Sequence, residues 1–444
     1  MTRFATYPEL YTARHAWLGE IPSTWCSVNI RLIAKRYSGG TPDKSNSLYW
    51  TDGTIPWLNS GEVNQGTIRV PTTFITEEAL SESSARWVPA NAIIIALAGQ
   101  GKTKGMAAIT AFKTTCNQSM AAVVFEIDHP KFMYWWLVSQ YRNIRGLASD
   151  DARDGLNLEM IATIPCPRPS APEQEKIAAF LDWKTGQIDA LIARKKELLE
   201  RLREKRLAVI TQAVTQGLNP AAAMRDSGIP WLGQVPQHWE VKKISYFARV
   251  VRGASPRPAG DPTYFHGEYM PWITVGEITK DEQIYLQSTE SMLTEEGASN
   301  SRVMTSGSLV VTNSGATLGV PKILALTGCA NDGVVAFEDL ADNVEKIFVY
   351  YFLESQTENL RERMKQGGGQ PNLNTDIIKA LSVPFPPMDE QTQIAQHLQS
   401  ATAKLASMTA KVVEVLERLS EYRAALIAAA TTGKIDVRNV NIPA

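Results

Sequence analysis

An internal repeat is the feature that most constrains how this sequence can fold. Segment 17–25, with the sequence WLGEIPSTW, returns at 231–239 as WLGQVPQHW, and a second block at 55–63 returns at 270–278. The order of the matched segments is kept and their offset drifts only from 214 to 217 residues along the chain, which indicates two diverged copies of one unit. A doubled unit has approximate two-fold symmetry, and duplex DNA is the commonest two-fold object that such a chain could read.

Length and composition predict a multidomain globular protein. The 444 residues suggest about three domains, and 44% hydrophobic with 20% charged residues provides ample core. No apolar run approaches the roughly 18 residues of a membrane helix, and the N-terminus lacks the apolar segment of a signal peptide. The four cysteines are scattered without a CxxC spacing, at Cys26, Cys116, Cys166 and Cys329. This argues against a disulfide framework or a zinc site and favours a reducing cytoplasm.

Charge and the dispersed histidines narrow the functional classes. The formal net charge of −1 argues against a free-standing nucleic-acid binder. Any DNA binding would have to rest on local basic clusters, or on a partner that neutralises most of the phosphate charge. The histidines show no metal-ligand spacing, and local context offers no Ser-His-Asp or Cys-His set. The sequence therefore gives no positive sign of catalysis or of a metal site.

The expected fold class is α+β, with two mixed α/β domains joined by two long antiparallel coiled-coil helices in a pseudo-two-fold repeat. In each copy, a globular part with short apolar runs bounded by glycines precedes a long helix, and Gln174 aligns with Gln391 near the helix starts. The expected boundaries are 1–169 for the first domain, 170–217 for the central helix, 218–387 for the second domain, 388–433 for the C-terminal helix and 434–444 for a tail.

Apolar residues in the two helices recur in steps of four and three, which predicts a heptad seam. Two such helices of equal length are expected to pack on each other and to form a rod with a globular unit near each end. The basic run 194–206 is either the solvated face of this pair or a contact with a partner protein or with DNA. The predicted seam positions are Ile177, Leu181, Ile188, Leu191, Leu198, Leu202, Ile394, Leu398, Leu405, Met408, Val415 and Leu419.

Residues 96–103, Ala-Leu-Ala-Gly-Gln-Gly-Lys-Thr, fit a relaxed phosphate-loop pattern after an apolar strand. A phosphate loop needs a helix immediately behind it, so that the helix N-terminus faces the phosphates. Residues 105–110 favour a turn and a strand instead, and the second copy keeps the glycines but not the lysine at 312–319. Both segments are therefore predicted to be tight glycine turns that present backbone N–H groups and small polar side chains.

Basic and small polar residues gather beside the matched glycine turns. There, phosphate contacts would set the register while Asn, Gln, Ser and Thr would read bases, although a single basic group is more often a solvated face. The candidate DNA-binding residues of the first copy are Arg36, Gly39, Gly40, Thr41, Ser60, Glu62, Gln100, Lys102, Thr103 and Lys104. Those of the second copy are Arg252, Ser255, Arg257, Thr274, Glu277, Asn313, Ser314, Thr317, Arg363, Lys365, Gln366 and Gln370.

The duplicated order of these segments resembles the specificity subunit of type I restriction-modification systems over essentially the whole chain. The resemblance rests on the Trp-Leu-Gly-Glu-Ile-Pro opening at 17–22 and the Ile-Pro-Trp-Leu-Asn-Ser-Gly-Glu block at 55–62, each with its copy. It also rests on Asn117-Gln118 and Asn331-Asp332, which follow the glycine turns, and on the Pro-rich stretch before each long helix. No single motif is decisive, but their duplicated order is highly specific.

The resemblance implies two target-recognition domains, each reading one half of a bipartite, asymmetric DNA target, and a helix pair that acts as a ruler. It implies double-stranded DNA, two methyltransferase subunits and two restriction subunits as partners. The chain is then expected to be non-catalytic and to bind no cofactor, since S-adenosylmethionine, ATP and magnesium would belong to the partner subunits. Two alternatives are a recognition module of another restriction-methyltransferase type and a coiled-coil protein adaptor without DNA binding.

Overall fold

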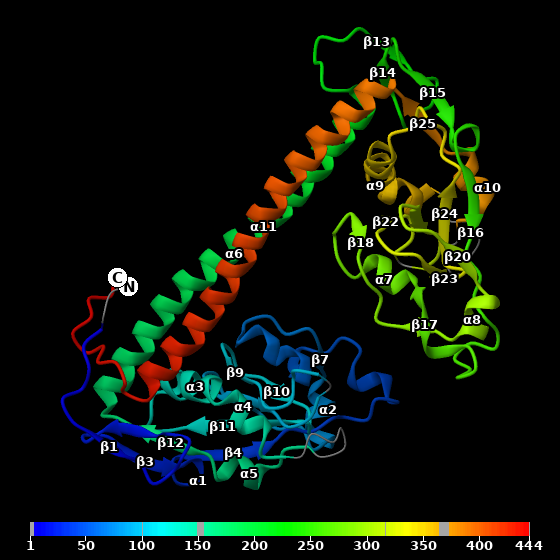
Figure 1. Ribbon diagram of the computed structural model, residues 1–444. Helices are drawn as coiled ribbons and strands as arrows, with labels where there is room; N and C mark the ends of the chain where they lie inside the picture. Colours follow the sequence, from blue (N-terminus) through cyan, green and yellow to red (C-terminus); the bar gives the residue numbers. More distant parts are fainter. Residues whose placement is uncertain (1–3, 100, 149–154, 316, 364–372, 444) are drawn as a thin grey trace. The chain divides into compact units, whose positions relative to one another are not determined.

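The computed structural model describes residues 4–99, 101–148, 155–315, 317–363 and 373–443 (Figure 1). The chain forms two compact units. Unit 1 comprises Met1–Lys196 and Val413–Ala444, and unit 2 comprises Glu197–Val412. Each long helix therefore contributes one half to each unit.

The centre of unit 1 is a five-stranded sheet in the order β4-β11-β8-β9-β6. One face of this sheet carries Ile93, Ile95 and Val123, and packs against helix α3 (Pro130–Ser139) and the start of the long helix α6. The opposite face packs against a smaller sheet, β10-β5-β7. The strands of the larger sheet are β4 (Ala34–Ser38), β11 (Met120–Phe125), β8 (Ile93–Ala96), β9 (Ala107–Thr110) and β6 (Thr67–Ile68).

Shorter elements complete unit 1. Strands β1 and β2 form a small hairpin, and β3 pairs with β12 just before α6 begins. The bounds of these elements are β1 (Leu10–Thr12), β2 (Glu20–Pro22), β3 (Cys26–Asn29), α1 (Ile30–Ile33), η1 (Ser47–Tyr49), β5 (Ile55–Leu58), η2 (Ser60–Gln65), β7 (Phe74–Ile75), α2 (Glu77–Glu82), β10 (Thr115–Cys116), α4 (Tyr141–Arg145), α5 (Leu158–Ala162) and β12 (Pro165–Arg168).

Unit 2 repeats the same topology, with the order β16-β24-β21-β22-β18 in its larger sheet. Helix α9 (Lys346–Arg363) covers one face, as α3 does in unit 1, and a smaller sheet, β19-β17-β23-β20, covers the other. The repeat in sequence is thus a repeat in fold, which confirms the predicted mixed α/β units. The larger sheet consists of β16 (Arg249–Arg252), β24 (Val334–Glu338), β21 (Leu309–Thr312), β22 (Pro321–Leu324) and β18 (Tyr285–Leu286).

Most of the remaining elements of unit 2 correspond to shorter elements of unit 1, although the smaller sheet of unit 2 has an additional strand, β20. Strand β15 pairs with β25 just before the second long helix, as β3 pairs with β12 in unit 1. These elements are β13 (Met224–Asp226), β14 (Gln234–Pro236), β15 (Glu240–Lys243), η3 (Ile244–Tyr246), β17 (Phe265–Ile273), α7 (Val275–Thr279), β19 (Met292–Leu293), α8 (Glu295–Ser299), β20 (Arg302–Met304), β23 (Gly328–Ala330), α10 (Thr375–Ala380) and β25 (Ser382–Phe385).

The two long helices are α6 (Ala171–Gln216) and α11 (Met388–Thr431). In unit 1, the core contains Ile177 from the start of α6 together with Leu426 from the end of α11. In unit 2, the core contains Val214 from the end of α6 together with Ile394 from the start of α11. The start of each helix therefore lies beside the end of the other, which confirms the predicted antiparallel pairing.

Both long helices end within two residues of a glycine in the left-handed region. The φ angles of Gly217 and Gly433 are +76° and +69°, a conformation that glycine adopts without the steric cost of a Cβ. None of the described helices, including α6 and α11, is apolar enough over a sufficient length to cross a membrane.

The seam prediction is only partly right. Six of its positions, Ile177, Leu181, Ile188, Ile394, Leu398 and Leu405, are buried, and Leu202 and Leu419 are half-buried. The other four are exposed, with exposed fractions of 41% for Leu191, 37% for Leu198, 54% for Met408 and 38% for Val415. A straight helix has 3.6 residues per turn and drifts by about 20° per heptad from a 3.5-residue repeat. The less exposed stripe of α6 accordingly moves to Ile192 and Leu199.

Candidate nucleic-acid interface

Three loops of unit 2 lie at one edge of its larger sheet. They follow the ends of β16 and β21 and precede the start of β24, and the strand register brings these three points together. Arg252 at the end of β16 is paired with Val335, and Thr312 at the end of β21 is paired with Val334. The candidates Arg252, Ser255 and Arg257, together with Ser314 and Thr317, belong to these loops, which we call the loop edge of unit 2.

Asp332 holds three of these candidates together. Its carboxylate accepts hydrogen bonds from the Ser255 hydroxyl at 2.7 Å and from Arg257 Nη2 at 3.1 Å, and its main-chain oxygen accepts one from Arg252 Nε at 2.6 Å. The hydrogen bond from Ser255, with the nearby guanidinium charges, lowers the pKa of Asp332 below its usual value. Asp332 was not among the predicted site residues, although the alignment of Asn331-Asp332 with Asn117-Gln118 marked the position.

Unit 1 has the same loop edge with different chemistry. The Thr41 hydroxyl hydrogen-bonds the side-chain oxygen of Gln118, as Ser255 does with Asp332 in unit 2. The candidate Arg36 is half-buried, and its Nη1 donates to the main-chain oxygen of Ala34 at 3.2 Å. An amide thus replaces the carboxylate in unit 1, and no described arginine of unit 1 hydrogen-bonds it.

The predicted glycines beside these loops have a packing role. A Cβ on Gly39 would lie 1.9 Å from the main-chain oxygen of Cys116, and one on Gly40 would lie 2.3 Å from Ser84. In unit 2, a Cβ on Gly253 would lie 2.1 Å from the main-chain oxygen of Asn331. Glycine is needed here because two main-chain segments approach each other closely, so these residues shape the loop edge from inside.

The glycine turn of unit 1 has the structure that the sequence predicts. Residues 101–105 form a turn that leads into strand β9, and the structure shows no helix there that could face a phosphate. Lys102 is exposed, and its main-chain oxygen accepts a hydrogen bond from the Tyr141 hydroxyl at 2.8 Å. Arg145 supports the turn by donating to the main-chain oxygen of Gly101 at 2.7 Å. Thr103 is half-buried, and Lys104 is buried with 6% exposure.

Two predicted DNA contacts, Glu62 and Glu277, are internal, and this corrects the sequence-based assignment. Glu62 is 5% exposed and accepts hydrogen bonds from the main-chain N–H groups of Asn59 and Thr72, both at 2.9 Å. Glu277 is 7% exposed and accepts from the N–H of Glu290 at 2.6 Å and from Lys280 Nζ at 2.7 Å. Each carboxylate ties a short helix to the loop that follows it. Their recurrence in the repeat therefore reflects a shared fold.

The remaining candidates lie in or beside these elements. Ser60 is half-buried in η2, and the Thr274 hydroxyl caps α7 by accepting from the N–H of Glu277 at 3.3 Å. The main-chain oxygen of Thr317 accepts from the Thr312 hydroxyl at 2.6 Å, inside its own turn. Gln100, Lys365, Gln366 and Gln370 lie outside the described residues, and the structure describes the backbone of Arg363 without its side chain.

Asn313 is fully buried, which also departs from its predicted role as an exposed contact. Its exposure is 0%, and neither polar atom of its side chain has a hydrogen-bond partner among the residues that the structure describes. Leu97 is its structural counterpart in unit 1. The N–H groups of Leu97 and Asn313 donate to Ser119 and Gly333, and their main-chain oxygens accept from Leu156 and Leu373. A buried, unpartnered amide thus occupies a position that is apolar in the other copy.

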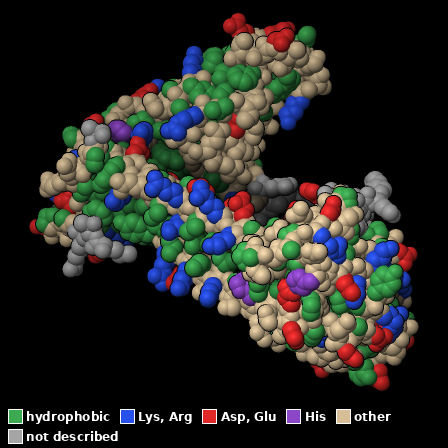
Figure 2. Space-filling model, turned by 90° about the horizontal axis from the view of Figure 1, so that it is seen from above, with side chains coloured by type: hydrophobic (Ala, Val, Ile, Leu, Met, Phe, Trp, Pro, Cys, Tyr) green, Lys and Arg blue, Asp and Glu red, His purple; other side chains and the backbone are tan. Residues whose placement is uncertain are grey.

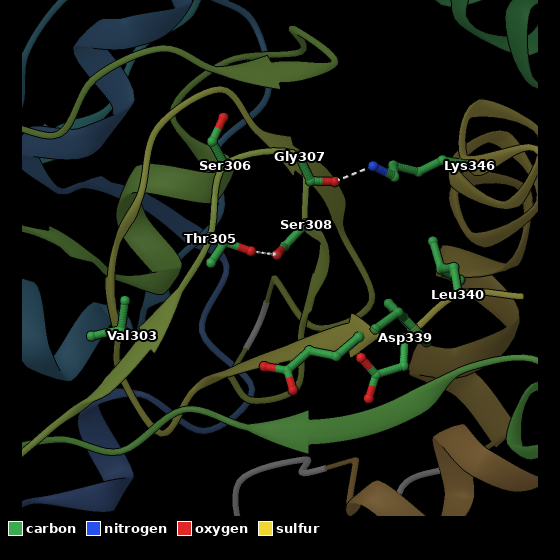
Figure 3. Close-up of a pocket in the computed structure, with 10 residues that line it drawn as sticks. Val303, Thr305, Ser306, Gly307, Ser308, Asp339, Leu340 and Lys346 are labelled. Carbon is green, nitrogen blue, oxygen red and sulfur yellow. Dashed lines mark hydrogen bonds between the residues drawn. The ribbon is translucent and has the colours of Figure 1, made fainter.

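A recess in unit 2 lies at the opposite end of β21 from the loop edge (Figure 3). It has a volume of about 430 Å³ and is lined by Thr305, Ser308, Asp339 and Lys346, among others. The Lys346 ammonium donates to the main-chain oxygen of Gly307, and Asp339 pairs with Arg249. Because its charged groups already have partners within the unit, this recess does not offer an open anion site.

The described residues show neither a large single-sign charged surface in the view of Figure 2 nor a metal site, and two of the cysteines are poorly reactive. Acidic and basic side chains are intermixed on the face that Figure 2 presents, as expected for a net charge of −1. Burial raises the pKa values of the Cys116 and Cys166 thiols, which keeps them protonated and poorly nucleophilic. The described parts of the chain contain no group of three or more His, Cys, Asp and Glu residues that could hold a metal ion.

Known proteins share both sequence and fold with this chain. Residues 22–201 and 236–418 match the Type I restriction modification DNA specificity domain. The specificity subunit of the type I restriction enzyme EcoKI from Escherichia coli is 21% identical over 434 residues, which cover 94% of this chain and 90% of that relative. The MjaIX specificity subunit from Methanocaldococcus jannaschii is 28% identical over 194 residues, which cover 43% of each protein. The chain thus spans less than half of that second relative.

Two solved structures have the same architecture. A chain from a study of complex assembly in the type I R-M system superposes with a TM-score of 0.73 and 14% identity, covering 94% of this chain and 99% of that one. The HsdS subunit from Thermoanaerobacter tengcongensis superposes with a TM-score of 0.51 and 16% identity, covering 94% and 98%. At such low identity these structures establish the fold alone. The match of residues 22–201 and 236–418 to the specificity domain, one in each copy of the repeat, establishes that the chain belongs to the type I restriction-modification DNA specificity family.

Proposed function

We propose that this chain is the DNA-reading specificity subunit of a type I restriction-modification complex, and that each unit reads one half of an asymmetric, bipartite target. The observation that carries the proposal is the repeated loop edge with different side chains, Thr41 and Gln118 in unit 1 and Ser255 and Asp332 in unit 2. The two loop edges therefore differ in charge and in hydrogen-bonding groups, and such differences on one scaffold favour different base sequences. Two different half-sites make the whole target non-palindromic.

Exposed apolar side chains on the helix pair support the recruitment of protein partners. In unit 1, a groove of about 440 Å³ is lined by Ile188, Leu191, Val415, Leu419 and Tyr422, together with Lys184, Gln187 and Arg418. Leu191 and Val415 are predicted seam residues that the partner helix within the chain leaves exposed. A contiguous apolar surface with a polar rim is typical of a protein-binding site, and a groove on a helix pair suits an apolar helix.

In the proposed complex, methyltransferase subunits dock on such helix surfaces, and two methyltransferase and two restriction subunits assemble around one specificity chain in the cytoplasm. The chain itself performs no chemistry. S-adenosylmethionine, ATP and magnesium are bound by the partner subunits. The near-neutral charge of the chain fits this division, since a subunit held inside a larger complex need not supply all of the phosphate neutralisation.

Sequencing methylated adenines in a host that expresses this chain with its methyltransferase tests the proposal. We expect a bipartite motif with a fixed gap and unlike halves. The matched control expresses the methyltransferase without this chain and should show no such motif. A perfectly palindromic motif would contradict different half-sites. Methylation that is unchanged without the chain would favour a protein adaptor. So would a complex that assembles with the methyltransferase but does not bind DNA.

A further inference from the structure

Two arginines at the loop edge of unit 2 hydrogen-bond to Asp332, Arg257 through the carboxylate and Arg252 through the main-chain oxygen. Arg257 Nη2 lies 3.1 Å from Asp332 Oδ2, and Arg252 Nε lies 2.6 Å from the main-chain oxygen of Asp332. The side chains of Arg257 and Asp332 are 69% and 43% exposed, so this ion pair faces solvent. Exposed ion pairs are weak, and their members exchange partners readily.

Unit 1 lacks this arrangement. In the repeat, Asp43 stands at the position of Arg257, and Gln118 stands at the position of Asp332. The Asp43 carboxylate accepts hydrogen bonds from the N–H and the hydroxyl of Ser45, both within its own loop. The acid–arginine contact is therefore a feature of unit 2 alone among these matched positions, and the shared fold does not require it.

We propose that Asp332 is an internal counter-ion that competes with DNA for Arg252 and Arg257, and so makes unit 2 discriminate against non-target DNA. This inference rests on the proposed DNA-reading function. In the absence of DNA, Asp332 satisfies the two arginines. When DNA binds, the arginines must leave Asp332 for a phosphate or a guanine edge, and the carboxylate is left close to the negatively charged backbone. Only a half-site whose base contacts compensate for the lost contacts with Asp332 binds tightly.

The exchange has a measurable electrostatic signature. Each phosphate that a protein neutralises contributes about −0.9 to the slope of log K against log salt concentration for duplex DNA. Removal of the Asp332 charge frees Arg257 for phosphate contacts that do not depend on sequence, and it weakens the attraction on Arg252, whose hydrogen bond to the main-chain oxygen remains. We therefore expect non-target affinity to rise about three- to tenfold at low salt, with a steeper salt dependence and a smaller ratio of target to non-target affinity.

The test compares Asp332→Asn with wild type in the complex with the methyltransferase, using fluorescence anisotropy on target and non-target duplexes over a salt series. Asparagine keeps an oxygen for the Ser255 hydroxyl, and unit 1 already carries an amide at this position in Gln118. The matched control is Asp261→Asn, which removes one negative charge from the same loop region. The Asp261 carboxylate accepts from the N–H of Thr263 at 2.9 Å, which asparagine can also do.

The expected result is a gain in non-target affinity for Asp332→Asn, no comparable gain for Asp261→Asn, and loss of the gain when Arg257→Ala is added. Equal gains in both Asp variants would overturn the proposal, because they would reflect net charge alone. Unchanged non-target affinity would also overturn it, as would loss of target binding, which would make Asp332 itself a base contact. Failure of the wild-type complex to prefer its target is a separate outcome and counts against the proposed function.

Discussion

Gln174 and Gln391 each hydrogen-bond residues at the same three matched positions of the two units, although one acceptor is a side-chain carboxylate in unit 1 and a main-chain oxygen in unit 2. Gln174 Nε2 donates to the main-chain oxygen of Pro169 at 3.1 Å and to Asp128 Oδ1 at 2.8 Å, while its Oε1 accepts from the N–H of His129 at 2.8 Å. Gln391 Nε2 donates to the main-chain oxygens of Pro386 at 2.9 Å and Asn343 at 3.1 Å, and its Oε1 accepts from the N–H of Glu345 at 2.9 Å. Each buried glutamine thus fastens the start of a long helix to the loop before the helix that covers the sheet.

Gln391→Ala should destabilise unit 2 by about 2–4 kcal/mol, because it leaves a buried N–H group and two carbonyl groups without their partner. Chemical denaturation of the purified chain measures this change. Gln393→Ala is the control, since Gln393 is exposed on the same helical turn and its loss should cost less than about 0.5 kcal/mol. Equal effects of the two substitutions would mean that the buried hydrogen bonds do not fasten the helix.

The helix seam gives a direct comparison between sequence periodicity and structure. Leu405 is 7% exposed and Met408 is 54% exposed, although the heptad pattern places both on the seam. Leu405→Ala should cost about 2–4 kcal/mol of unfolding free energy, and Met408→Ala less than about 1 kcal/mol. Thermal or denaturant unfolding of the two variants measures the difference. A large cost for Met408→Ala in the chain alone would restore the heptad assignment.

Asn313→Leu should stabilise the chain. The substitution removes a buried amide that has no partner in the described part of the chain, and it installs the residue that Leu97 provides at the matched position of unit 1. We expect a gain of about 1–3 kcal/mol, measured by denaturant unfolding. The reverse change, Leu97→Asn, is the control and should cost at least as much. A destabilised Asn313→Leu variant would show that the amide has a partner in solution, such as a buried water molecule.

Substitution of Lys322 and substitution of Asp281, which form an ion pair, should lower the unfolding free energy by different amounts, and the effect should depend on pH. Lys322 is 1% exposed, and its ammonium lies 2.6 Å from Asp281 Oδ1, whereas the Asp281 side chain is 41% exposed. Asp281→Asn leaves the buried ammonium without its counter-charge, although its hydrogen bond to the main-chain oxygen of residue 281 remains, and should cost roughly 2–4 kcal/mol, less than for a fully buried pair. Lys322→Met leaves a carboxylate that water can solvate, and should cost roughly 1 kcal/mol or less.

The pH dependence of this pair has a definite sign. The hydrogen bond from Lys322 lowers the pKa of Asp281 from its ordinary value of 3.8 in the folded state. The resulting stabilisation is fully present above pH 3.8 and is lost as the pH falls through the lower folded-state pKa. The unfolding free energy of wild type minus that of Asp281→Asn should therefore shrink below about pH 4. A difference that stays constant down to pH 2 would contradict the pair.

Sequence reasoning predicted the repeat, the mixed α/β units and the antiparallel helices because periodicity and segment order depend on many residues at once. It failed where the role of a residue depends on a single contact in the folded structure. The repeat marked Glu62 and Glu277 as special, but a repeat does not show whether a side chain faces outward, and both are internal. Asp332 was missed because Ser255 and Arg257 lie 77 and 75 residues away in sequence, so only the strand register brings them together.

The last prediction concerns helix length, on the proposed function. Insertion of seven residues after Leu198 in α6 and after Val415 in α11 turns the apolar stripe by only about 20° and adds about 10 Å to each helix. If the helix pair runs along the duplex, the gap between half-sites should grow by about three base pairs, or fewer if the pair is tilted. The half-site sequences should not change, because the loop edges of both units are untouched.

Insertion in α6 alone is the control and should abolish methylation, since unequal helices cannot stay in register. The measurement is the methylated motif of the altered complex, and altered half-site bases, or an unaltered gap with full activity, would rule out the ruler.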